Sequence, residues 1–399
     1  MKTPLVALNL LHQPVRTATA ILGVAFAVLL IFMQLGFYGS AEMSATRLYD
    51  ALDFDLLLRS RDYLCLTSAR PFPRYRLQEV LGHAEVTAAA PIYISWQLWR
   101  IPAEDRGIKY YADHDYRHYR RAILVLAFNL QDAVFRPLPH GEPPGPNSLR
   151  KLATPNTVLV DTYTRKYFGK HSQGVQAELS GAAVTVEGQF TIGTGLGADG
   201  LLIMSDRTYT RLAGAAALDQ PTLGLIKLQP QARSRAAAIK EELHQSLDAG
   251  RSDVEVLTRK EVERRELDYW LKRTPVGVIF TLGVLVACLV GIIFVYQVIA
   301  TDIADHAAEY ATLRAIGYST RYLSGVVLRQ ALAFALLGYT PGLLAALLLY
   351  WLGQRYEQIL LFPSWERAAA VLLLAIAMCS LSGLLAVHKV KAVDPADQF

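Results

Sequence analysis

Hydrophobic residues gather in four long runs that are separated by polar stretches of very unequal length. The runs cover residues 17–40, 274–301, 331–354 and 368–387, and the first two contain no charged residue. Each run has roughly 20 residues or more, which is enough for a helix to cross a hydrocarbon core of about 30 Å. A polar stretch of roughly 230 residues separates the first run from the second. We therefore predict an α-helical membrane protein with four transmembrane helices and a large domain between the first and the second.

The long polar stretch contains short runs rich in β-branched and aromatic residues, bounded by turn-forming residues. Such runs predict strands, here at 54–58, 92–98, 123–128, 158–160, 183–192, 201–204, 223–228 and 254–257. A helix-forming segment at 232–247 lies between two of them, as in a βαβ unit. The charged segment 260–271 predicts a helix that leads into the second span, and the proline-rich segment 136–148 predicts a loop. We expect an α+β domain, with two lobes as one option.

The distribution of basic residues predicts the orientation in the membrane. The termini and the segment between the second and third spans carry Lys2, Arg16, Arg314, Arg321, Lys389 and Lys391. Short segments rich in Lys and Arg stay in the cytoplasm, so both termini are expected there and residues 41–273 outside. Lys272 and Arg273 oppose this orientation, but long domains cross the membrane largely regardless of charge. The apolar core of the first run exceeds the 7–15 residues of a signal peptide, which favours an uncleaved anchor.

Two local patterns resemble binding motifs. Residues 195–200 match G-x-G-x-x-G, but a predicted strand follows them instead of a helix that could hold a pyrophosphate. A glycine-rich hairpin or bulge is the better interpretation. His114 and His118 have the i, i+4 spacing of a metal-binding pair. Their segment is also rich in Tyr and Arg, which favours a solvated surface over a metal site.

The sequence contains no recognisable catalytic machinery. The phosphate-binding motif G-x-x-x-x-G-K-[ST] is absent, so ATP hydrolysis by this chain is not expected. No nucleophile–base pattern or strong metal signature stands out either. The formal net charge of +5 suits basic residues flanking membrane spans, and it does not require a nucleic-acid partner. We predict no catalytic residue, cofactor site or metal site here.

The segment 302–317 predicts a short amphipathic helix after the second span. Thr301 or Asp302 can cap its start, and Gly317 can end it in the left-handed conformation. Residues that recur at helical spacing form one mostly apolar stripe: Ile303, Ala307, Tyr310 and either Leu313 or Arg314. Such a helix at the cytoplasmic mouth of two spans can dock a partner, and an inert interfacial helix is the alternative.

The third span contains residues that disturb a regular helix. Pro341 removes a backbone hydrogen bond and clashes with the preceding turn, and it lies between Gly338 and Gly342. A bend is expected there, either as a static kink or as a hinge. The four spans carry almost no charge at membrane depth, where ionisable residues usually mark a polar pathway.

The whole chain resembles the permease subunits of MacB/FtsX-type (type VII) ABC exporters, and within them the DevC-like permeases. The resemblance rests on segments at 190–193, 199–200, 274–283, 296–297, 301–318, 338–342, 378–379, 382–383, 394–397 and Phe399. The C-terminal segments match most specifically, and residues 60–180 match only diffusely. Relatives often carry Glu where this chain has Gln330.

The resemblance implies a division into residues 1–40, a periplasmic domain at 41–273 and an FtsX-like permease domain at 274–399. It implies a homodimer in the inner membrane that binds a separate ABC ATPase, which would hold ATP and Mg²⁺. It also implies a periplasmic adaptor (membrane fusion) protein joined to an outer-membrane channel. Segment 302–317 would be the coupling helix seated on the ATPase, with contacts from Asp305, His306, Glu309, Tyr310, Leu313, Arg314 and Gly317.

Three functions fit these observations. An export permease for a lipid, glycolipid or other hydrophobic substrate is favoured by the resemblance. An FtsX-like mechanotransmitter that controls a periplasmic enzyme without transporting anything shares every feature named above. A membrane-anchored enzyme would need a clustered acid–base or metal site in the large domain, and the sequence indicates none.

Overall fold

The computed structural model describes residues 14–100, 120–138, 141–248, 252–305, 316, 319–357 and 361–392. The chain divides into two compact units, which are treated separately here. The membrane unit comprises Met1–Ser40 and Pro275–Phe399, and the globular unit comprises Ala41–Thr274. Helix α2 (Pro14–Ala51) contributes to both, because its last eleven residues belong to the globular unit.

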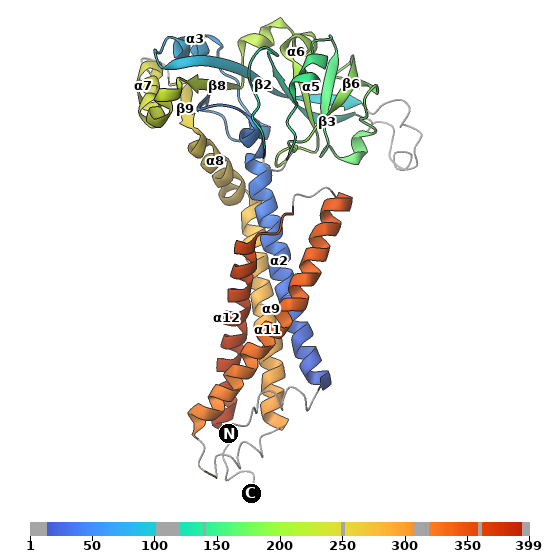
Figure 1. Cartoon of the computed structure of the whole chain (residues 1–399), viewed down its shortest axis with the longest axis vertical. Helices are drawn as coiled ribbons and strands as arrows, with labels where there is room; N and C mark the ends of the chain where they lie inside the picture. The colour runs from blue at the N-terminus through green and yellow to red at the C-terminus, as the bar shows by residue number, and fades with distance from the viewer. Residues whose placement is uncertain are drawn as a thin grey trace. The chain divides into compact units, whose positions relative to one another are not determined.

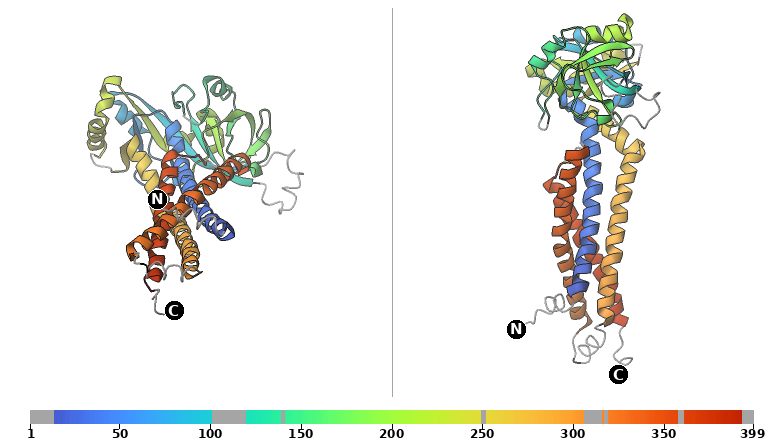
Figure 2. Two further views of the ribbon diagram at one scale, coloured as in Figure 1. Left: turned by 60° about the horizontal axis from the view of Figure 1, so that its bottom comes forward. Right: turned by 90° about the vertical axis from the view of Figure 1, so that its right-hand side faces the viewer.

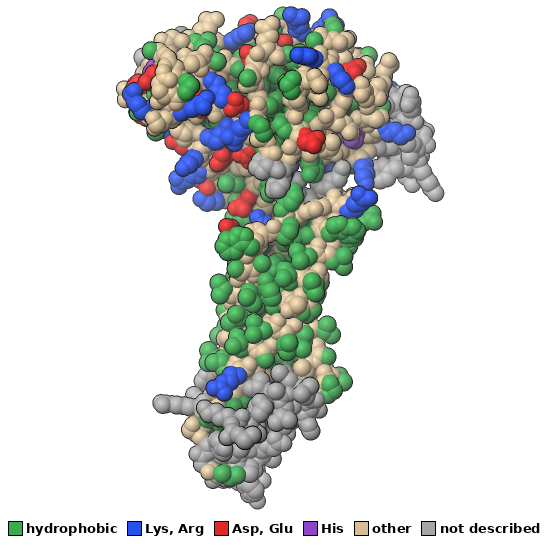
Figure 3. Space-filling model, viewed as in Figure 1, with side chains coloured by type: hydrophobic (Ala, Val, Ile, Leu, Met, Phe, Trp, Pro, Cys, Tyr) green, Lys and Arg blue, Asp and Glu red, His purple; other side chains and the backbone are tan. Residues whose placement is uncertain are grey.

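The membrane unit is built from four long helices, as the hydrophobic pattern predicts (Figure 1). These are α2, α9 (Pro275–Asp305), α11 (Thr320–Leu352) and α12 (Trp365–Ala392), and a π-helical turn, η8 (Gly353–Glu357), follows α11. All four are long and apolar enough to span a membrane. Hydrophobic side chains dominate the visible face of this unit, whereas acidic and basic side chains are spread over the globular unit (Figure 3).

Helix α2 is the most buried of the four spans. Half of its most apolar window is buried inside the protein, compared with 17% for α9. Its residues Val24, Val28 and Ile31 are fully buried in a core shared with α9, α11 and α12. The other three helices therefore pack around α2, which lies beside α9 and α12 in both views of Figure 2.

The globular unit is an α+β domain, as predicted, and its described residues form a single mixed sheet of nine strands. The strands are β1 (Leu56–Ser60), β2 (Val86–Arg100), β3 (Arg120–Phe128), β4 (Thr157–Asp161), β5 (Gln176–Leu179), β6 (Ala182–Phe190), β7 (Leu201–Ser205), β8 (Leu223–Leu228) and β9 (Val254–Thr258). The helices are α3 (Tyr75–Leu81), α5 (Pro146–Lys151), α6 (Asp206–Ala213), α7 (Ala236–Asp248) and α8 (Arg259–Asp268). Shorter helical turns are η1 (Leu66–Ser68), η4 (Lys166–Phe168), η5 (Ala215–Asp219), η6 (Pro230–Arg235) and η7 (Tyr269–Arg273), the last of them π-helical.

Strand β2 is long enough to join two different lobes. Its second half pairs with β3 and, at Trp99 and Arg100, with β5, so that β2, β3, β7, β4, β6 and β5 close into a barrel. Its first half pairs with β8, which continues to β1 and β9. Strands β8 and β9 lie on either side of β1 and are connected through α7, which is a split form of the predicted βαβ unit.

Both faces of the central strands are buried. Alternate residues of the barrel strands, such as Val125, Val160 and Leu202, fill the barrel interior. The residues between them, such as Leu124 and Ile203, pack on the other face against the end of α2 and the start of α8. Strands β3 and β7 are continuous apolar runs in the sequence because each has a hydrophobic core on both sides.

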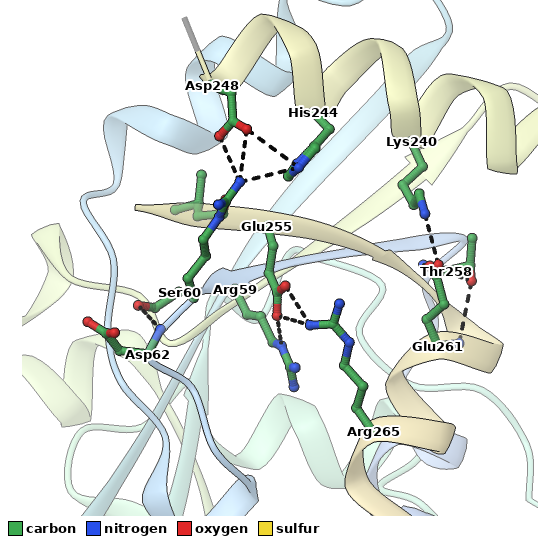
Figure 4. A network of polar contacts seen from close by, with 12 residues as sticks. Arg59, Ser60, Asp62, Lys240, His244, Asp248, Glu255, Thr258, Glu261 and Arg265 are labelled. Carbon is green, nitrogen blue, oxygen red and sulfur yellow. Dashed lines mark hydrogen bonds and ion pairs between the residues drawn. The ribbon is translucent and has the colours of Figure 1, made fainter. Parts of the chain in front are cut away.

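Helix α8 is fixed to the sheet by a capping box and an ion-pair network (Figure 4). The Thr258 side chain accepts a hydrogen bond from the backbone of Glu261, whose carboxylate accepts the Thr258 N–H at 2.8 Å. Glu255 on β9 accepts from the buried guanidinium of Arg59 at 2.9 Å and from Arg265 on α8 at 2.5 Å. The start and the middle of α8 are therefore both tied to the β1–β9 edge of the sheet.

Candidate functional site

The predicted coupling segment lies largely beyond the described residues. His306, Glu309, Tyr310, Leu313, Arg314 and Gly317 are outside them, and Asp305 is described only as the last residue of α9. The predicted helix start at Thr301 or Asp302 is wrong, because α9 continues through both residues. The Thr301 hydroxyl donates to the carbonyl of Gln297 at 2.8 Å, one turn back in the same helix. The next helix, α11, is capped at its start by Ser319, whose side chain accepts the N–H of Tyr322.

The glycines of the third span form a close contact with α2. A Cβ atom at Gly338 would lie 2.6 Å from Cβ of Val24, and one at Gly342 would lie 2.7 Å from the carbonyl oxygen of Ala25. Small residues four positions apart allow two helix backbones to approach in this way. Helix α11 runs without interruption through Pro341, so a hinge at this position stays a prediction.

Three polar side chains between the spans bind backbone carbonyls of neighbouring helices. Three hydroxyls donate to a carbonyl of a neighbouring helix: Tyr339 to Ala368 (3.0 Å), Ser382 to Ile292 (2.9 Å) and Tyr350 to Phe32. Gln330, where the DevC-like relatives often carry Glu, is 4% exposed. These contacts tie the four helices into one packed body.

A buried carboxylate in the globular unit joins the segments by which the chain enters and leaves that unit. Glu266 on α8 is 1% exposed. Its carboxylate accepts hydrogen bonds from the Leu66 N–H (2.9 Å), the Trp270 indole N–H (3.2 Å) and the Tyr49 hydroxyl (3.1 Å). Tyr49 lies near the end of α2, and its hydroxyl also contacts that of Tyr63. One side chain therefore connects α2, η1, α8 and η7.

The environment of Glu266 favours a rigid connection. Burial raises the pKa of its carboxyl, and the hydrogen bonds from Leu66, Tyr49 and Trp270 act in the opposite direction. A hydrogen bond to a charged group contributes about 1.5–3 kcal/mol, and a buried group that loses its partners costs a comparable amount. Displacing α2 from α8 would break the hydrogen bond from Tyr49 to this buried carboxylate, which opposes such a displacement.

The glycine-rich loop predicted at residues 195–200 packs against this junction. It follows β6 and precedes β7, as expected from the strand pattern, but β6 and β7 pair with β4 and not with each other, so the loop is not a hairpin. Gly195 and Gly197 have φ values of +80° and +84°. A Cβ at Gly195 would lie 2.9 Å from Leu66, and one at Gly197 would lie 2.8 Å from Trp270. The glycines allow the loop to contact the residues that Glu266 holds.

A second buried carboxylate anchors the start of that loop. Asp161, at the end of β4, accepts the backbone N–H groups of Tyr163 (2.7 Å), Ile192 (3.0 Å) and Gly193 (2.7 Å). Burial raises the pKa of Asp161 to about 6, although the three N–H groups and Arg47 favour the charged form. The hydrogen bonds are structural, because they hold backbone from two adjacent connections.

The histidine pair His114 and His118, for which a solvated surface was predicted, lies outside the described residues. A different group, His83, Glu85 and Glu242, brings its ligand atoms within 4.8 Å of one another. However, Nδ1 of His83 accepts the N–H of Glu85, so the neutral ring carries its proton on Nε2, which faces Glu242 at 3.2 Å. Arg235 also contacts both carboxylates, at 2.9 and 3.7 Å, and this group is an ion-pair cluster.

Sequence reasoning missed the junction around Glu266. The segment is rich in both acids and bases, so one glutamate among them carries no distinctive pattern. The available signal is weak: Glu266 lies one turn after Val262, which is fully buried, and therefore shares its inward face. Tyr49 and Leu66 are 217 and 200 residues away along the chain, and only the fold brings them to this carboxylate.

Comparison with known proteins bears on both units. Residues 281–395 match the family model of the FtsX-like permease C-terminal region. The periplasmic region of MacB from Actinobacillus actinomycetemcomitans is similar over 53% of this chain and 91% of that one, with 8% identity and a TM-score of 0.34. The extracellular domain of the noncanonic ABC-type transporter YknZ from Gram-positive bacteria is similar over 51% and 99%, with 10% identity and a TM-score of 0.31. A search of curated proteins finds no match.

The family match covers most of α9 and all of α11 and α12. These helices, together with α2, form the tightly packed membrane unit described above. The C-terminal membrane segment of this protein, residues 281–395, is therefore similar to the C-terminal region of FtsX-like permeases.

Proposed function

We propose that this chain is the permease subunit of an ABC exporter and transmits ATP-driven motion to an adaptor and an outer-membrane channel. The observation that carries the proposal is the FtsX-like permease match at residues 281–395, within a chain that has four apolar spans. The sequence has no phosphate-binding loop, so a separate ATPase would hold ATP and Mg²⁺. The substrate class is a lipid, a glycolipid or another hydrophobic molecule.

The ATPase would dock on the segment between α9 and α11. By the positive-inside rule, this segment and both termini would lie in the cytoplasm and the globular unit in the periplasm. Tyr310 and Leu313 share a face of the predicted helix, and aromatic and aliphatic anchors of this kind dominate binding energies at interfaces. Residues Glu309 and Arg314 can add charge-assisted hydrogen bonds at the edge.

The membrane unit would act as a homodimer. The surface of α9 carries a row of apolar side chains that are 50–62% exposed in the single chain: Val278, Ile279, Leu282, Leu285, Val286, Leu289 and Ile293. Such a row can face either lipid or a second copy. Its position on the least buried helix supports α9 as part of the dimer contact.

Motion, rather than passage between the helices, is the proposed output. The apolar runs contain almost no charged residue, and the polar side chains between the helices bind backbone carbonyls. The Glu266 junction would carry a displacement of α2 or α8 into the sheet of the globular unit. The adaptor would receive this movement on the globular unit.

The test removes the proposed ATPase anchors. The variant Tyr310→Ala/Leu313→Ala should lose roughly 2–4 kcal/mol of docking energy, a drop in affinity of about 30-fold or more. It should accumulate in membranes as the wild type does, yet fail to co-purify with its ATPase and fail to export. Tyr356→Ala, at an exposed tyrosine after the opposite end of α11, is the matched control. Normal ATPase capture by the double variant would place docking elsewhere.

A second measurement separates export from control of a periplasmic enzyme. Cells that lack the chain should retain a lipid or other hydrophobic compound that wild-type cells deliver to the outer membrane or medium, as measured by extraction and mass spectrometry. If the extracted compounds are unchanged while cell-wall hydrolysis is lost, the chain is a mechanotransmitter and not an exporter.

A further inference from the structure

The segment that precedes the second span presents a basic face. Lys260 and Arg264 on α8 and Lys272 and Arg273 in η7 are all exposed. Lys260 and Arg264 are four residues apart and lie on one side of α8, and Lys272 and Arg273 follow in η7. The opposite side of α8 is buried in the globular unit through Val262 and Glu266.

Acidic residues compensate this face only in part. Lys272 is paired with Asp268 at 2.6 Å. Arg264 and Arg273 also favour the charged form of Asp268 and hold its pKa below the usual value, after the larger effect of Lys272. Among the described residues, no ion pair joins Lys260, Arg264 or Arg273 to a carboxylate of its own. Asp268 therefore faces three cations, and Glu263 lies near Lys260.

Chain connectivity places part of this face at the membrane surface. The apolar span begins at Pro275, only two residues after Arg273 and three after Lys272. The connecting residue Thr274 has extended backbone, so at up to about 3.5 Å per residue both lie within roughly 10 Å of the start of the span. The polar headgroup layer beside a hydrocarbon core is roughly 5–7 Å thick, so these two cations lie within reach of lipid phosphates.

The cations are held by a rigid support. They belong to η7, whose Trp270 donates its indole N–H to the buried Glu266 and packs against Gly197. Tyr269 stacks edge-on against Trp270 with ring centroids 5.4 Å apart. Tyrosine and tryptophan favour the membrane interface, and a fixed support reduces the entropy lost when basic side chains bind.

We propose that Lys272 and Arg273 form a contact surface for the phosphate headgroups of anionic phospholipids. The relevant leaflet is the one at which the second span begins. Two exposed cations next to an apolar helix match a negatively charged lipid surface in both charge and position. This surface would hold η7 against the membrane and make its position sensitive to lipid composition.

The experiment uses the full chain in liposomes of phosphatidylcholine with a minor fraction of phosphatidylglycerol. After mild detergent extraction, native mass spectrometry measures the ratio of the two lipids that remain bound. The wild-type chain should be enriched in phosphatidylglycerol. In the variant Lys272→Gln/Arg273→Gln, enrichment should fall about fivefold per cation removed, equivalent to about 1 kcal/mol each, and up to about 25-fold in all. Higher salt should weaken the wild-type enrichment.

The control variant Arg150→Gln/Arg207→Gln removes two exposed cations from α5 and α6. Its lipid ratio should remain that of the wild type. An unchanged ratio in the Lys272/Arg273 variant, or an equal loss in both variants, would overturn the proposal. The same holds if that variant keeps its lipids but loses an acidic protein partner in pull-down, because the basic face would then serve protein docking. Circular dichroism should be the same for all three chains.

Discussion

Gly197→Ala tests whether the contact between the glycine-rich loop and η7 is as tight as the geometry indicates. Gly197 has φ of +84°, and a Cβ atom there would lie 2.8 Å and 3.3 Å from two ring carbons of Trp270. Carbon atoms do not approach to 2.8 Å, so the indole or the loop must move. Gly174 provides the matched control, since its φ is +89° and a Cβ there would meet nothing within 4 Å.

The two substitutions share one cost and differ in another. An alanine in the left-handed region costs roughly 1–2 kcal/mol at either position. At Gly197 the shifted indole also weakens its hydrogen bond to Glu266, and a buried carboxylate that loses a donor costs about 1–3 kcal/mol more. We therefore expect Gly197→Ala to destabilise the globular unit by about 1–3 kcal/mol more than Gly174→Ala does.

Thermal unfolding of the full chain in detergent, followed by tryptophan fluorescence, measures this difference. For a unit of this size, 1 kcal/mol corresponds to about 2–4 °C, so the two variants should differ by roughly 2–12 °C. The Leu66 N–H donates a hydrogen bond to the Glu266 carboxylate. Hydrogen exchange at this N–H should therefore accelerate in Gly197→Ala and not in Gly174→Ala. Equal unfolding temperatures and equal exchange in the two variants would show that Trp270 yields freely and that the contact has no structural role.

Three further predictions concern other parts of the chain. Gly342→Ala should destabilise the membrane unit by about 1–3 kcal/mol, because a Cβ atom there would collide with α2. Gly325→Ala, where a Cβ atom would meet nothing within 4 Å, should instead stabilise α11 by up to about 1 kcal/mol. If both variants shift the unfolding temperature in the same direction, the close contact between α11 and α2 is contradicted. The pKa of Asp161 is raised to about 6 from 3.8, so the stability gained from its protonated form is complete below about pH 3.8 and is lost as pH rises through about 6. In denaturant unfolding, the free energy of unfolding of the wild-type chain should therefore fall between pH 4 and 7 by on the order of 2–3 kcal/mol more than that of Asp161→Asn. If the two chains show the same pH dependence of unfolding free energy, the raised pKa of Asp161 is refuted. In a chain without its native cysteines, Gln173→Cys should react with an impermeant thiol reagent added outside and Ile316→Cys should not; the opposite labelling would reverse the topology.

Local patterns were sufficient for the elements of this protein. The four apolar runs became α2, α9, α11 and α12, because a membrane span needs only length and low polarity. The eight predicted strands correspond to eight of the nine observed. The missing one, β5 (Gln176–Leu179), has four residues and alternates polar with apolar positions too briefly to be recognised.

The boundaries of helices were harder to predict, because a helix that has already formed can extend past a residue that could cap a new one. The pattern placed a helix start at Thr301 or Asp302, since such residues cap helices. In the structure α9 continues to Asp305, because a helix already formed through the span adds further turns more easily than a new helix nucleates. Local capping chemistry could not reveal that the preceding helix had not ended.

Long-range contacts decided what the elements do together. The sequence alone determined the four spans, the α+β class, the absence of a phosphate-binding loop and the resemblance to ABC permeases. Only the tertiary structure closed six strands into a barrel, placed Gly338 and Gly342 against α2, and brought Tyr49 and Leu66 to Glu266. The physical reason is that hydropathy and helix periodicity act between residues a few positions apart, whereas a buried carboxylate takes its donors from whichever segments the fold packs around it.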